Sequence, residues 1–62
     1  MENGDIVTIY RYPMLQNEIE GKAKLLNYIG IDGYYNKKVL QLWQVNFIGD
    51  DPTEKYYRTI LI

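Results

Sequence analysis

Apolar and polar residues alternate along three segments of the chain, which is the pattern of β-strands with one buried face. Residues 6–12, 21–29 and 39–48 are rich in β-branched and aromatic side chains, and the alternation is strictest around Trp43. A fourth apolar segment covers residues 55–62. The pattern therefore predicts an all-β chain built from four or five short strands.

The segments between these strands carry turn chemistry. Pro13 cannot donate a hydrogen bond to a sheet, so we expect the first strand to end there and residues 14–20 to form an irregular connection. Two glycines, an aspartate and an asparagine within residues 30–36 predict a hairpin loop. The polar residues 49–54, which include Pro52, predict a second tight connection.

A helix is the alternative for the second predicted strand. Ile19, Ala23 and Leu26 are spaced to lie on one face of a helix. Gly21 lies inside the same window and is unfavourable in a helix interior. The strand is therefore the preferred interpretation.

The parity of each strand predicts the side chains of the core. In the last strand an unpaired buried guanidinium would be costly, so we expect Arg58 to face solvent and its immediate neighbours to face inward. The predicted core residues are Val7, Ile9, Ala23, Leu25, Trp43, Val45, Phe47, Tyr57, Thr59 and Leu61.

Four short strands must cover one apolar face, and curling the sheet into a barrel does so. At GDIVTIY, EGKAKLL, WQVNF and YYRTI the chain resembles a small Src-homology-3-like barrel. The resemblance implies one antiparallel barrel of four to five strands that spans residues 1–62 as a single domain. The layout is similar to that of short uncharacterised proteins of phages and bacterial mobile elements, which implies no activity. The acidic, aromatic run with which Src-homology-3 domains bind proline-rich peptides is missing.

The composition excludes several kinds of chemistry. The chain has no Ser, Cys or His, which excludes disulfides and catalysis by a Ser–His or Cys–His pair. Asp50, Asp51 and Glu54 are neighbours, but they lie in a predicted exposed turn where nothing separates their pKa values. Their spacing is not that of a calcium-binding loop. We therefore expect no enzymatic activity, no cofactor and no metal site.

Charge and hydropathy predict the surroundings of the chain. The net charge is −1 and the pI is about 5.1, so no global positive field draws it to nucleic acid or to an anionic membrane. No apolar run approaches the ~20 residues that span a bilayer, and the first residues lack the layout of a signal peptide. These features predict a cytoplasmic protein without membrane association.

Tyrosines and cations on the expected surface are the candidate binding residues. Such residues are typical of protein-binding hot spots, and they also suit a single-stranded nucleic acid whose bases stack on the rings. Tyrosine is equally common in strands for packing reasons. Because the pI is low, we favour a non-enzymatic module that binds another protein, with single-stranded nucleic acid as the alternative partner. The candidates are Tyr10, Arg11, Tyr12, Tyr34, Tyr35, Lys37, Lys38, Tyr56 and Arg58.

Aliphatic side chains also occupy the parity opposite to the predicted core. They are Leu40, Leu42, Ile48, Ile60 and Ile62. A monomeric barrel would expose them as an apolar patch, which a homo-oligomer would bury. The alternative is that residues 14–19 fold over the patch and cover it.

Overall fold

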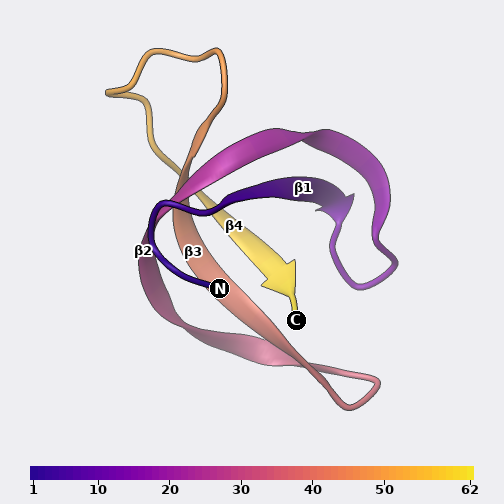
Figure 1. Cartoon of the computed structure of the whole chain (residues 1–62). Helices are drawn as coiled ribbons and strands as arrows, with labels where there is room; N and C mark the ends of the chain where they lie inside the picture. Colours follow the sequence, from indigo (N-terminus) through magenta and orange to yellow (C-terminus); the bar gives the residue numbers. More distant parts are fainter.

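The computed structural model describes all 62 residues as one antiparallel sheet of order β1-β2-β3-β4 (Figure 1). The strands are β1 (Ile6–Tyr12), β2 (Asn17–Tyr35), β3 (Lys38–Phe47) and β4 (Tyr56–Leu61). The predicted all-β class is confirmed. No helix is present that could cross a membrane.

β1 and β4 are the two edges of the sheet. The sheet curls until these edges approach each other (Figure 1), yet β1 pairs only with β2 and β4 only with β3. Side chains of both edges, including Thr8 and Thr59, line a hollow of about 160 Å³ between them. No hydrogen-bonded ladder joins β1 to β4, so the sheet is not closed into a barrel.

The start of β2 differs from the prediction. The predicted irregular connection over residues 14–20 shortens to a tight turn, and the strand begins at Asn17. In this turn the Leu15 amide donates to the Tyr12 carbonyl at 3.2 Å, and Gln16 has a φ of 49°. A backbone in the left-handed region reverses the chain in few residues, so the strand resumes earlier than Pro13 suggested.

The end of β2 also corrects the sequence reading. Residues 30–36 were expected to form a loop, but β2 continues to Tyr35 and the turn consists of Asn36 and Lys37. Both turn residues have positive φ, 52° and 66°, as a two-residue hairpin turn requires.

The distal half of β2 is bulged at every third residue. Tyr28 pairs with Trp43 and Ile31 pairs with Gln41, so three steps along β2 match two steps along β3. The residues left out of the pairing are Leu26, Ile29 and Asp32. Each bulge lengthens β2 relative to β3 and increases the local twist, which explains the wide arc of β2 in Figure 1.

Small residues recur with the same period of three. Asn27, Gly30 and Gly33 face side chains of β3 on the outer face of the sheet. A Cβ atom at Gly33 would lie 3.6 Å from Cδ1 of Leu40, which is buried over this glycine. The glycines therefore belong to a bulged strand and not to a loop, which is why their usual meaning as turn signals was misleading.

The core lies on the inner face of the curled sheet. It consists of Ile9, Ala23, Leu25, Trp43, Val45 and Ile60, with Val7 and Phe47 packed against it. The predictions for β1, for the first half of β2 and for β3 are thus confirmed, with Val7 and Phe47 only partly buried.

β4 faces the other way from the prediction. Ile60 is buried, whereas Tyr57 is 58% exposed, and Thr59 and Leu61 lie half-buried on the opposite face. The prediction assumed that Arg58 would have no partner, but Glu20 supplies one. With its charge compensated, Arg58 shares the inner face with Ile60.

The aliphatic residues of opposite parity do not form one patch. Leu40 is buried and Leu42 half-buried on the outer face, and Ile60 belongs to the core. Ile48 and Ile62 remain exposed. Residues 14–19 are themselves exposed.

Candidate binding surfaces

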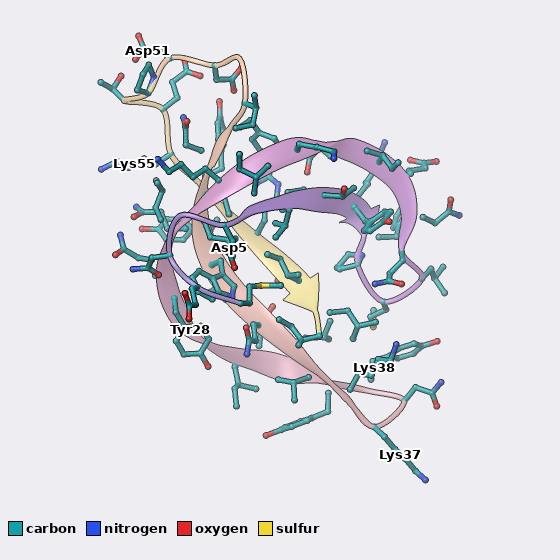
Figure 2. The ribbon with its side chains drawn as sticks, viewed as in Figure 1. Asp5, Tyr28, Lys37, Lys38, Asp51 and Lys55 are labelled. Carbon is teal, nitrogen blue, oxygen red and sulfur yellow. The ribbon has the colours of Figure 1, made fainter.

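The nine candidate residues fall into two separate groups. Tyr34, Tyr35, Lys37 and Lys38 lie at the tip of the β2–β3 hairpin, where Figure 2 shows both lysines far from the β3–β4 loop with Asp51. We call residues 27–41 the hairpin arm. The other five lie on β1 and β4, and we call them the edge cluster: Tyr10, Arg11, Tyr12, Tyr56 and Arg58.

Arg58 is the most constrained side chain of the edge cluster. Its Nε donates to Oε1 of Glu20 at 2.8 Å and its Nη2 donates to Oε2 at 2.9 Å, while Nη1 donates to the Tyr57 carbonyl at 2.9 Å. The guanidinium also lies over the rings of Phe47 and Tyr56, at 5.5 and 5.4 Å from their centroids. A bidentate pair stacked on aromatic rings holds one orientation.

The pair shifts the titration of both partners. The hydrogen bond from Arg58 lowers the pKa of Glu20, and the charges of Arg58 and Arg11 act in the same direction against partial burial. The same hydrogen bond raises the pKa of Arg58. Both groups are therefore ionised at neutral pH.

Two hollows meet at the Glu20–Arg58 pair. One of about 390 Å³ opens on the side of Phe47 and Tyr56, and one of about 280 Å³ opens on the side of Tyr10 and Arg11. The smaller hollow lies between the two edge strands and is lined by Tyr10, Arg11, Pro13, Glu20, Tyr57, Arg58 and Thr59. The structure thus adds Tyr57 to the candidates, a residue that the parity argument had assigned to the core.

Arg11 is held more loosely than Arg58. Its Nη1 lies 3.7 Å from Oε2 of Glu18, and both side chains are more than half exposed. Its guanidinium lies 5.5 Å from the centroid of the Tyr12 ring. An exposed pair of this kind contributes about 0–1 kcal/mol, so Arg11 can exchange Glu18 for another acceptor at little cost.

The arm carries an apolar row that the sequence reading missed. Exposure rises along one face of β2, from Leu25 at 0% through Tyr28 at 47% and Ile31 at 55% to Tyr34 at 72%. We call Tyr28, Ile31 and Tyr34 the inner row, because their register partners lie on the same face as Trp43. A search for a period of three in large apolar residues would have found the row, whereas alternation with a period of two could not.

Hydrogen bonds to the Asp51 carboxylate and from the Asn46 side chain stabilise the turn of the β3–β4 loop. Asp51 accepts hydrogen bonds from the amide and the hydroxyl of Thr53 at 2.9 and 2.8 Å, and the first of these does most to lower the pKa of Asp51. The Asn46 side chain donates to the carbonyls of Asp51 and Glu54, which fixes the loop on β3. Glu54 also raises the pKa of Tyr56 through its charge. No group of three or more potential ligands that could hold a metal ion is present.

Comparison with known proteins gives no match, whether with family models, with curated proteins or with solved structures. The two surfaces and their chemistry are therefore the basis for a functional proposal.

Proposed function

We propose that this chain is a non-enzymatic module that binds another protein through the edge cluster. The observation that carries the proposal is the hollow between β1 and β4, where Arg11, Tyr10 and Tyr57 surround the fixed Arg58 guanidinium. Arginine and tyrosine are enriched among the residues that dominate binding energy in protein interfaces. Arg58 is already held in one orientation, so a partner can bind it with little loss of side-chain entropy. Arg11 can leave Glu18 and adjust its position to the partner.

Electrostatics favours a protein partner over single-stranded nucleic acid. Glu20 and Glu18 each pair with an arginine of the cluster, so the cations are already compensated. Binding of a phosphate backbone depends on uncompensated positive charge. Lys37 and Lys38 make no ion pair, but they lie on the arm and not with the edge cluster.

The proposal includes the expected setting of the protein. The curled all-β sheet supports a small Src-homology-3-like barrel that is left open between β1 and β4. Such a module would act as an accessory protein of a phage or mobile element, which is the setting that the sequence resemblance implies, and in the cytoplasm, as charge and hydropathy predict.

Affinity capture with matched variants tests the proposal. We expect wild-type protein to retain a specific protein from bacterial lysate, and the variant Tyr10→Ala/Arg11→Ala to retain at least about tenfold less of it, because hot-spot truncations cost ~2 kcal/mol or more. Tyr35→Ala/Lys38→Ala on the arm is the control and should retain as much as wild type. Equal loss in both variants would contradict binding through the edge cluster.

Titration with oligonucleotides tests the alternative partner. Fluorescence of Trp43 and the tyrosines should change little at micromolar oligonucleotide, at either low or moderate salt. Micromolar, salt-sensitive binding without any captured protein would replace the proposal with nucleic-acid binding.

A further inference from the structure

The inner row of the hairpin arm is a largely exposed apolar sheet face, and Met1 lies near it only at the base, where Met1 and Tyr28 line one hollow. The β1 ladder on β2 ends at Lys24 and backbone hydrogen bonds with Gly4 and Asp5 extend it to Leu25, so beyond Leu25 β2 has β3 as its single neighbour in the sheet. Tyr28, Ile31 and Tyr34 are each about half exposed or more. Contiguous exposed apolar residues on a strand mark a contact surface.

We infer that this face binds a second copy of the chain, in an antiparallel arrangement about a two-fold axis. The inference is independent of the proposed function, because the edge cluster does not include the inner row. Three observations favour a second copy of the chain as the partner. They are the distribution of charge along the arm, the hydrogen-bonded polar groups at its base and the small size of the core.

Charge along the arm is self-complementary. Lys37 and Lys38 form the tip, and the carboxylates of Glu2 and Asp5 lie at the base, where the Leu25 amide donates to the Asp5 carbonyl at 2.8 Å. Figure 2 shows Asp5 and Tyr28 at the base and both lysines at the tip. The two-fold arrangement places the tip of each copy beside the base of the other. A parallel arrangement would instead bring four lysines together, so charge also selects the orientation.

Other charges on the arm do not disturb this match. Asp32 is the only carboxylate between residues 27 and 41. Its Oδ2 accepts a hydrogen bond from the Thr59 hydroxyl at 2.7 Å, on the outer face and away from the inner row. Within residues 27–41 positive charge therefore lies only at the tip, and at the base the α-amino group of Met1 is outnumbered by the carboxylates of Glu2 and Asp5.

The base of the row is apolar and its polar groups are already satisfied. Met1, Tyr28, Gln41 and Trp43 line an open hollow of about 300 Å³. Within it the indole Nε1 of Trp43 donates to Oε1 of Gln41 at 3.0 Å, and the rings of Tyr28 and Trp43 meet edge to face at 5.4 Å. Because the indole N–H already has an acceptor, the ring of Tyr34 of a second copy can cover the hollow without leaving the indole donor unpaired, while its own hydroxyl stays at the open side.

The core of a single copy is small. Seven side chains are buried, and the chain has no cysteine for a disulfide. Burying two inner rows against each other would join two such cores, because Tyr28 already contacts Trp43 of the core cluster. Association of this kind is one of the few ways in which a small core gains stability.

Sedimentation equilibrium over a wide range of concentrations tests the inference. We expect wild-type protein to reach twice its monomer mass reversibly. The variant Ile31→Lys should remain folded by circular dichroism, because this side chain is 55% exposed, and should be at least tenfold weaker in association. The control Ile19→Lys makes the same change on the same strand, at a site 70% exposed outside the arm, and should associate like wild type.

A charge swap tests the orientation. We expect Lys37→Glu to weaken association and the double variant Lys37→Glu/Glu2→Lys to restore it, because opposite charges again meet across the two-fold axis. Should Ile31→Lys fail to fold, Tyr34→Lys at the 72% exposed tip provides the same test. A wild-type protein that stays monomeric at millimolar concentration overturns the inference, as does equal association of the Ile31→Lys and Ile19→Lys variants. A captured partner that depends on Arg11 while the chain stays monomeric would retain the proposed function and reject this inference.

Discussion

The two halves of β2 belong to one strand and both contact β3, but only the first half also pairs with β1, and their inner-face side chains lie in opposite environments. Ala23 and Leu25 in the first half are fully buried, whereas Ile31 and Tyr34 in the second half are mostly exposed. Both halves place apolar side chains on the inner face, so hydrophobicity alone does not decide burial. Ala23 and Leu25 are buried because β1 lies beside them and β4 curls across from them, bringing Ile9 and Ile60 onto the same face.

The comparison shows that a curled sheet forms a core only where all of its strands overlap. A fully buried aliphatic side chain contributes about 1.5–3 kcal/mol, while one left half exposed contributes correspondingly less. We call the end of the sheet that holds the core cluster of Ile9, Ala23, Leu25, Trp43, Val45 and Ile60 the packed end. It therefore carries the stability of the monomer. The arm extends this framework and leaves its apolar residues free for contact.

The largest expected effect lies at the boundary between the two regions. Trp43 is 3% exposed, and its removal should cost about 3–5 kcal/mol, enough to unfold a domain of this size. Tyr35→Ala on the arm should change stability by less than about 0.5 kcal/mol. Thermal melts followed by circular dichroism compare the two variants, and an unchanged melt for Trp43→Ala would show that the core lies elsewhere.

Substitutions in β4 test the orientation of the edge strand. Ile60→Ala should destabilise the chain by about 2 kcal/mol or more, because the side chain belongs to the core. Tyr57→Ala, three positions earlier in the same strand, should have little effect, since Tyr57 is 58% exposed. Urea titration measures both variants. The reverse order of their midpoints would restore the orientation expected from sequence parity.

The turn of the arm allows a stabilising change. Lys37 has a φ of 66°, a region that glycine adopts without steric cost. Lys37→Gly should therefore stabilise the chain by about 0.5–1 kcal/mol relative to Lys37→Ala, which removes the same charge but keeps the Cβ atom. Chemical unfolding of both variants at low protein concentration isolates this effect. Equal stability would argue against the left-handed conformation at this position.

A smaller effect concerns the stability of the chain at acid pH, which depends on the Glu20–Arg58 pair. The pKa of Glu20 is lowered from 4.5 when the chain folds, so the Arg58 pair stabilises the folded state above about pH 4.5, and this stabilisation is lost as the pH falls through the lowered pKa. Below about pH 5 the free energy of unfolding should fall less in Glu20→Gln than in wild type. The difference should be at most about 1 kcal/mol, because the pair is about one third exposed. Glu18→Gln is the control, since its contact with Arg11 is longer and more exposed, and its melts should follow the wild-type pH profile. A Glu20→Gln profile identical to wild type would contradict the role of the pair.

Much of the packed end could be predicted from local pattern. β1 and the turn after β3 agree with the sequence reading, and alternation around Trp43 identified the buried face of β3. Alternation works there because each residue of a regular strand has one partner across the ladder.

The remainder depended on contacts between residues distant in sequence. The partner of Arg58 lies 38 residues earlier, in a segment expected to be irregular, so the compensation of its charge could not be seen locally. The glycines of β2 predicted a loop although they lie in a bulged strand, because bulged strands and loops use the same small residues. Seven of the nine candidate residues are exposed, while Tyr10 and Arg58 are half-buried, and their division into an edge cluster and an arm follows from the register of β2 on β3.

Hydrogen exchange along β2 tests the contrast between its two halves most directly. At the lowest protein concentration that permits the measurement, amides of Ala23 and Leu25 should exchange only through global unfolding, and amides of the distal half, from Tyr28 to Tyr34, should be at least about tenfold less protected because the arm opens locally. Equal protection of both halves under these conditions would contradict the account, because it would show that the arm belongs to the same cooperative core as the packed end.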